Sequence, residues 1–291
     1  MRGRIATTTL VVGTIAFALF VGHANAKSDK EACSTTSTDV TNTNTDGTAV
    51  ECDASSGPPN KATAHASDEG SAASVAEDGG NSVSSASGED AGAGAEADGG
   101  AKATATASGD DTEATAVSVS GTTKATAKGE ASDATSVIEE TGGGKATSTA
   151  TDGGEAVALI PDGGGGDVVA TAKDDGEASS DVVSGGGKAT TDSSGDGSDA
   201  EAESAGGGTA KATASGGASD VTADTVEDCK ATATGSGTGG ESVAVCDNEG
   251  SVVKATATKG STAIGSDTDA PTCSPMNGGI AKVRSPMGNC G

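Results

Sequence analysis

Six cysteines are the residues of this 291-residue chain whose type and spacing most clearly predict chemistry. They are Cys33, Cys52, Cys229, Cys246, Cys273 and Cys290. An even number of cysteines is typical of disulfide-linked exported proteins, and the sequence alone does not fix the pairing. The short, nearly equal separations within successive pairs favour bonds between neighbours. None of the six lies in a CxxC motif, so redox catalysis and zinc ribbons have little support.

Other reactive residue types do not form a catalytic pattern. His65 is the only histidine after the first 26 residues, and no GxSxG nucleophile turn accompanies it. Two Gly-Gly-Gly-Lys phrases, ending at Lys145 and Lys188, lack the Ser/Thr that a phosphate-binding loop needs after its lysine. Adjacent carboxylates are frequent, but few bulky residues are present to form a pocket around them. We therefore expect the protein not to be an enzyme, and we expect no cofactor.

One segment has the spacing of a calcium-binding loop. From Asp192 to Glu203 it carries Asp196 and Gly197 at matching positions, with Ser194 at the third position. It lacks Asp or Asn at the third position and an apolar residue at the eighth. An Asp/Gly/Ser-rich chain produces such matches by chance, so we expect only weak, non-specific calcium association and assign no metal ligand.

The N-terminus has the features of a secretory signal. Arg2 and Arg4 precede an apolar run from Leu10 to Val21, and Ala24-Asn-Ala26 is a small-x-small cleavage site. The run is too short for a good membrane span. We expect residues 1–26 to be removed, the mature protein to be secreted, extracellular or periplasmic, and the mature chain to have no membrane span.

The composition excludes several other classes of protein. Asp and Glu number 43 against 17 Lys and Arg, the net charge is −26, and the chain has no Trp or Tyr and two Phe. Nucleic-acid binding needs clustered basic residues, so we expect no nucleic-acid partner. High net charge with few large apolar residues is also typical of disordered chains.

A phrase beginning Lys-Ala-Thr repeats along the chain. It starts at Lys61, Lys102, Lys124, Lys145, Lys188, Lys211, Lys230 and Lys254. The spacing corresponds to a period of roughly 20–24 residues, within the range of repeat arrays. In the period that begins at Lys102, residues 102–107 and 113–119 both alternate small and polar side chains, and Gly, Asp and Ser separate them. This alternation predicts two strands per repeat.

Stacked repeats of this kind predict an all-β fold. Ala103, Ala105 and Ala107 would point inward, and Lys102 and Thr104 outward. We predict a narrow, Ala/Thr/Gly-rich parallel β-solenoid with disulfide-stapled ends. The alternative is a largely disordered low-complexity chain. The predicted division is a signal peptide at 1–26, an N-terminal loop with Cys33 and Cys52 at 27–60, a repeat region at 61–269 and a C-terminal disulfide cap at 270–291.

Thr-x-Thr pairs give the predicted outer face a further feature. They occur at Thr104/Thr106, Thr147/Thr149, Thr232/Thr234 and Thr256/Thr258. These pairs resemble the Thr-x-Thr face of insect antifreeze solenoids, which implies ice binding. The other repeats carry Lys128, Lys173, Asp192 or Ser215 where the second Thr is expected. The small-residue repeats also resemble, loosely, those of bacterial surface adhesins, although no anchor domain is recognisable.

The sequence thus favours an exported, non-enzymatic structural or surface repeat protein presenting an acidic, Thr-rich face. Its partners would be extracellular matrix, polysaccharide or further copies of itself. The alternative function is an ice- or crystal-surface-binding or calcium-associated solenoid.

Overall fold

The computed structural model describes most of the chain from residue 31 to residue 284. The described ranges are 31–34, 39–43, 50–54, 61–67, 70–77, 79–99, 102–139, 143–161, 165–217, 220–226, 230–236, 241–246, 252–258, 262–266, 272–276 and 280–284. Side chains are described only between residues 61 and 256. The signal-peptide prediction for residues 1–26 lies outside these ranges.

Two parallel sheets make up the described structure. The 13-stranded sheet contains β1 (Glu31–Ser34), β3 (Val50–Ala54), β5 (Ala72–Ala76), β7 (Gly92–Ala97), β9 (Glu113–Ser118), β11 (Asp133–Ile138), β13 (Glu155–Ile160), β15 (Glu177–Val182), β17 (Ala200–Ala205), β19 (Val221–Val226), β21 (Glu241–Cys246), β23 (Thr262–Ser266) and β25 (Ile280–Arg284). The 12-stranded sheet contains β2 (Asp39–Thr43), β4 (Lys61–Ala66), β6 (Asn81–Ser87), β8 (Lys102–Ser108), β10 (Gly121–Lys128), β12 (Gly144–Thr151), β14 (Asp167–Ala172), β16 (Lys188–Ser194), β18 (Thr209–Ser215), β20 (Lys230–Ser236), β22 (Val252–Thr258) and β24 (Thr272–Met276).

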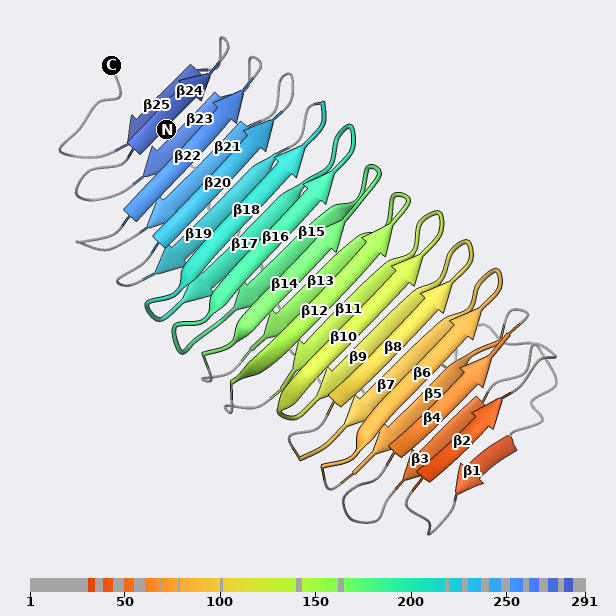
Figure 1. The fold of residues 1–291 in the computed structure, drawn as a ribbon. Helices are drawn as coiled ribbons and strands as arrows, with labels where there is room; N and C mark the ends of the chain where they lie inside the picture. Colours follow the sequence, from red (N-terminus) through yellow and green to blue (C-terminus); the bar gives the residue numbers. More distant parts are fainter. Residues whose placement is uncertain are drawn as a thin grey trace, which may run out of the picture.

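Successive strands alternate between the two sheets, so the chain winds as a β-solenoid (Figure 1). Each strand pairs in parallel with the strand two positions along the chain, for example β8 with β10 and β10 with β12. No helix occurs in the described ranges. The predicted all-β parallel solenoid is confirmed.

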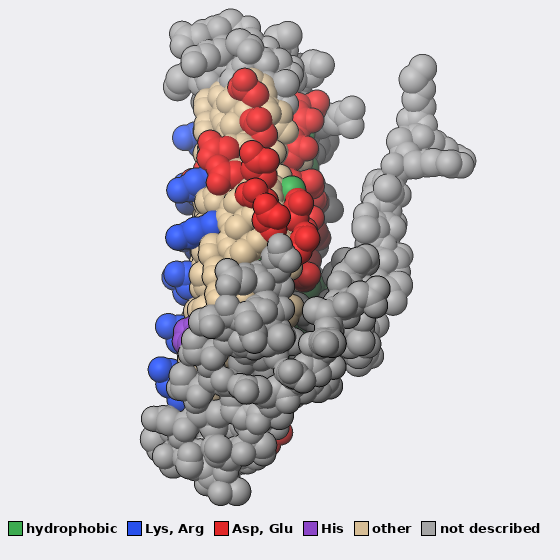
Figure 2. Space-filling view, turned by 90° about the vertical axis from the view of Figure 1, so that its right-hand side faces the viewer, with side chains coloured by type: hydrophobic (Ala, Val, Ile, Leu, Met, Phe, Trp, Pro, Cys, Tyr) green, Lys and Arg blue, Asp and Glu red, His purple; other side chains and the backbone are tan. Residues whose placement is uncertain are grey.

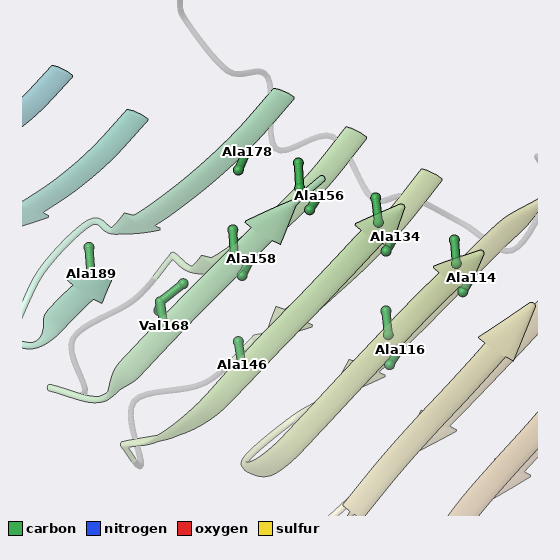
Figure 3. Packing of buried hydrophobic residues seen from close by; sticks show 14 of the residues in the cluster. Ala114, Ala116, Ala134, Ala146, Ala156, Ala158, Val168, Ala178 and Ala189 are labelled. Atoms are coloured by element: carbon green, nitrogen blue, oxygen red, sulfur yellow. The ribbon is translucent and has the colours of Figure 1, made fainter. Parts of the chain in front are cut away.

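The interior between the sheets consists mainly of alanine. Ala103, Ala105 and Ala107 are fully buried, as the alternation predicts, and Lys102 on the same strand is exposed. On the facing sheet, Ala114, Ala134, Ala156 and Ala178 follow one another on adjacent strands, and Figure 3 shows Ala146, Val168 and Ala189 of the other sheet nearby. Only small side chains occupy most inward positions, which explains why so few large apolar residues suffice.

Hydroxyl groups fill several of the remaining inward positions and link the sheets. The Ser136 hydroxyl on β11 donates to the Thr147 carbonyl oxygen at 2.6 Å and accepts from the Ala125 amide at 3.0 Å, both on the 12-stranded sheet. Ser180 and Thr191 share a hydrogen bond of 2.5 Å across the interior. These buried hydroxyls are tolerated because they find hydrogen-bond partners across the interior.

The strands are not confined to residues 61–269. Three lie within 27–60 and two within 270–291. Cys33 on β1 and Cys52 on β3 are Cα partners, and Cys52 is in turn the partner of the buried Ser74. Adjacent strands lie ~4.8 Å apart, within the Cα–Cα range of a disulfide. Cys246 ends β21 and Cys273 lies on β24, whereas Cys229 and Cys290 lie outside the described ranges. The predicted disulfide pairing stays a prediction.

Candidate binding faces

The outward residues of the 12-stranded sheet form what we call the lysine face. We define it by three columns of Cα partners on β4 to β22. The first column is Lys61, Asn81, Lys102, Thr122, Lys145, Asp167, Lys188, Thr209, Lys230 and Val252; the second is Thr63, Val83, Thr104, Lys124, Thr147, Val169, Thr190, Lys211, Thr232 and Lys254; the third is His65, Ser85, Thr106, Thr126, Thr149, Thr171, Asp192, Thr213, Thr234 and Thr256. The face therefore carries eight lysines and two aspartates.

The lysines of this face are staggered so that no two of them are Cα partners. Lys102 and Lys145 lie in the first column, and Lys124, on the strand between them, lies two residues further along its strand, in the second column. Lys188, Lys211 and Lys230 repeat this arrangement. Like charges directly opposite each other on adjacent strands are destabilising, and the stagger avoids that contact.

The same register makes the threonine column more regular than the sequence indicates. Because the phrases at Lys124 and Lys211 are displaced by two residues, Thr126 and Thr213 lie in the third column. Lys128 and Ser215, expected there from the sequence, lie beyond the column, at the ends of their strands. The expectation of an interruption in four repeats was wrong for three of them, since Thr171 fills the column on β14. From β8 to β22, only Asp192 interrupts the threonines.

The outward residues of the 13-stranded sheet form a contrasting surface, which we call the carboxylate face. We define it by the carboxylates that project from β7 to β21 or immediately precede these strands. They are Glu96, Glu113, Asp133, Glu155, Glu177, Asp181, Asp199, Glu201, Glu203, Asp220, Asp224 and Glu241. None of the odd-numbered strands from β5 to β21 contains Lys or Arg. Figure 2 shows lysines in a row along one side of the molecule and carboxylates across the neighbouring surface.

Seven of these carboxylates follow one another in a single column at the start of the strands. The column runs Glu113, Asp133, Glu155, Glu177, Asp199, Asp220 and Glu241. Three aspartates in it also have a structural role. The carboxylate of Asp133 accepts a hydrogen bond from the Glu155 amide at 3.1 Å. In the same way, Asp199 accepts from the Asp220 amide at 3.1 Å, and Asp220 accepts from the Glu241 amide at 3.0 Å. These bonds from backbone amides offset part of the repulsion within the column.

A second group of carboxylates crowds the middle of the face. Asp181, Glu203 and Asp224 are Cα partners on β15, β17 and β19. Burial, followed by the nearby charges of Glu203 and Glu201, raises the pKa of Asp181 to about 7. Burial, Glu203 and Glu177 likewise raise the pKa of Glu201, and burial with Glu177 and Asp133 raises that of Glu155. The crowding therefore opposes ionisation.

The turns that lead from the 12-stranded sheet to the 13-stranded sheet add further carboxylates. Asp90, Asp111 and Asp152 adopt positive φ angles of 55°, 53° and 62°. Aspartate is among the few non-glycine residues that adopt this backbone conformation readily. Part of the acidity along this edge thus follows from what the turns require.

The structure does not assemble the calcium-loop candidate. Asp192 points outward from the 12-stranded sheet and Glu203 outward from the 13-stranded sheet, so the first and last positions lie on opposite faces. Within the described part of the chain, no group of three Asp, Glu, His or Cys side chains is arranged to hold a metal ion. His65 lies outward on β4, at the first position of the third column.

Sequence reasoning missed the separation of the two faces. Threonines and carboxylates were expected to share one surface, but the nearly continuous column of threonines lies on the lysine face. The sequence does contain the pattern that separates the faces. Each odd-numbered strand from β9 to β15 begins with Asp or Glu, and the Lys-Ala-Thr phrases fall on even-numbered strands. Finding it required assigning the two strands of every repeat separately.

Comparison with known proteins adds little about function. Residues 1–140 match the model of a family of unknown function (DUF6764), which covers just under half of the chain. No curated protein and no solved structure matches the chain. Among the described residues, no helix has the length and apolar character needed to cross a bilayer.

Proposed function

We propose that this chain is an exported, non-enzymatic structural or surface protein that acts through its two extended, oppositely charged faces. The observation that carries the proposal is the separation of eight lysines from the carboxylates over the same run of coils. Flat sheets with regularly repeated side chains suit a periodic partner, such as a matrix polysaccharide, better than a small molecule, which needs a concave pocket. The predicted N-terminal signal sequence supports export to where such partners occur.

Fractionation of the native host tests this function. We expect the protein to leave the cytoplasm, to begin at Lys27 by mass spectrometry, and to be retained with the cell surface or matrix. A variant with Lys102→Gln, Lys145→Gln, Glu155→Gln and Glu177→Gln should fold but shift to the soluble medium, because two charges are removed from each face. Retention in the cytoplasm, or unchanged surface retention of the variant, contradicts the proposal.

Ice or crystal-surface binding is the second candidate, and the nearly continuous threonine column favours it. Thr106, Thr126, Thr149 and Thr171 are consecutive Cα partners. The neighbouring column is less regular, because Lys124 and Lys211 replace threonine there. This candidate predicts that the mature protein shows thermal hysteresis. The double substitution Thr126→Lys/Thr149→Lys should abolish the hysteresis. The matched Thr115→Lys/Thr135→Lys variant, which changes the other sheet, should keep it. Weak, non-specific calcium association stays a prediction for the carboxylate face.

A further inference from the structure

We propose that the lysine face of one copy docks onto the carboxylate face of a second copy, with the two solenoid axes aligned. This inference rests on the proposed structural role and names a partner for both faces. It assigns the partner by charge complementarity, by matching periodicity and by area.

Charge complementarity is the first argument. The lysine face carries eight lysines against Asp167 and Asp192, and the odd-numbered strands from β7 to β21 carry or directly follow carboxylates and contain no Lys or Arg. Carboxylates that are direct neighbours, such as Glu155 and Glu177, repel each other. A sheet of lysines placed over the column would lower that repulsion, so each face supplies what the other lacks.

The matching periodicity of the faces is the second argument. Both faces belong to one solenoid, so their charges repeat along the axis with the same strand spacing of ~4.8 Å. A lysine that meets a carboxylate at one coil therefore allows the next lysines to meet carboxylates further along. An unrelated partner would need to reproduce this spacing, whereas a second copy has it by construction.

The flatness and size of the lysine face form the third argument. Between its lysines lie mainly threonine, serine and valine, which permit close approach of a second sheet. Ten strands at ~4.8 Å, with about 20 Å of strand length each, give a face of roughly 1,000 Å². A stable interface needs roughly 800 Å² per partner. The face is therefore large enough to hold a second copy.

The net charge of −26 does not prevent such docking at physiological ionic strength. The Debye length there is about 8 Å. The two sheets are stacked about 10 Å apart, and their outward side chains are further apart still. A docked copy therefore interacts mainly with the face that it touches, and the opposite face is largely screened.

The geometry also predicts the type of assembly. Each copy offers one face of each kind, so the contact is heterologous and leaves both outer faces of a pair free to bind again. Association should thus give an open series of stacked copies that grows with protein concentration, and high salt should dissociate it.

Sedimentation velocity of the mature protein in EDTA and 0.15 M NaCl tests this inference. The wild type should form a concentration-dependent series that disappears at 1 M NaCl. Lys145→Glu/Lys188→Glu and Glu113→Lys/Glu177→Lys should each weaken association at least tenfold, because reversed charges replace attraction by repulsion in every copy. The matched variant Lys128→Glu/Lys173→Glu makes the same charge change at the edge of the sheet, beyond the third column, and should weaken association less. Circular dichroism melts establish that each variant is folded.

An equimolar mixture of the two face variants gives the sharpest result. Each variant keeps one intact face, and the two reversed faces are again opposite in charge, so the mixture should associate where neither variant does so alone. A monomeric wild type at all concentrations, or a mixture that stays monomeric, overturns the inference. A monomeric wild type that binds polyglutamate beads through Lys145 and Lys188 would assign the lysine face to an acidic polymer instead. Surface retention in the fractionation experiment is measured separately, so loss of self-association alone leaves the proposed function standing.

Discussion

The two faces of the solenoid enclose the same interior but distribute charge by opposite rules. On the lysine face, no two lysines are Cα partners, because alternate phrases are displaced by two residues along their strands. On the carboxylate face, Glu113 pairs with Asp133 and Glu155 with Glu177. The difference teaches that one fold can separate like charges on one sheet and stack them on the other. Three of the stacked aspartates, Asp133 among them, also accept a hydrogen bond from an amide of the next strand.

The largest expected effect comes from breaking the alternation that creates the two faces. Ala105 is fully buried and Thr106, its neighbour, points outward. Ala105→Lys would place an unpaired ammonium in an interior that has no space for it, and should destabilise the fold by about 3–5 kcal/mol. Thr106→Lys should change stability by less than about 0.5 kcal/mol. Thermal melts by circular dichroism measure both; similar melting temperatures would contradict the inward position of Ala105.

Cross-linking of one sheet is the next largest effect. Cys33 and Cys52 are Cα partners at positions in register with the buried Ser74 of the 13-stranded sheet. A disulfide between them would cross-link β1 to β3, the first two strands of the 13-stranded sheet. We expect non-reduced peptide mapping to recover this pair. Cys33→Ser/Cys52→Ser should lower stability by about 2–4 kcal/mol. Reduction should then destabilise the wild type more than this variant, and equal effects would contradict the pairing.

The interior was predictable from sequence because strand alternation is local. The alternation from Ala103 to Ala107 predicts which side chains point inward, and this prediction does not depend on how the neighbouring strands are paired. The fold class followed, since only stacked coils bury such thin, repeated segments. The presence of strands at 31–54 was not predicted, because that segment lacks the Lys-Ala-Thr phrase.

The arrangement of the faces was not predictable in the same way because register depends on turn lengths. Only Val119 and Ser120 separate β9 from β10, and β10 consequently begins at Gly121, three residues before Lys124. Lys124 thus becomes the partner of Thr104 and not of Lys102. Such offsets between coils determine whether charges meet, and alternation within a strand carries no information about them.

Neutralising charges should distinguish the stacked face from the staggered one. Glu155→Gln/Glu177→Gln removes direct carboxylate neighbours and should raise stability by about 1 kcal/mol at low salt. The matched change on the other face, Lys145→Gln/Lys188→Gln, removes no lysine–lysine contact and should alter stability by less than about 0.3 kcal/mol. Urea denaturation gives both values, measured at protein concentrations below any association. The gain should vanish at 1 M NaCl, and a gain independent of salt would point to a cause other than charge repulsion.

The smallest expected effect concerns the titration of Asp181 on the carboxylate face. Its pKa is raised to about 7, first by burial and then by Glu203 and Glu201. The folded state therefore binds this proton more tightly than the unfolded state, whose carboxyl has a pKa near 3.8. Its contribution to stability is fully present below the unfolded pKa and is lost as the pH rises through about 7. Because the side chain is partly exposed to solvent, we expect a loss of about 0.5 kcal/mol or less between pH 5 and pH 8. Asp181→Asn should flatten this part of the pH profile, and Asp192→Asn on the lysine face should leave it unchanged. Equal flattening by both variants would place the pH dependence elsewhere than in the crowded carboxylates of β15 and β17.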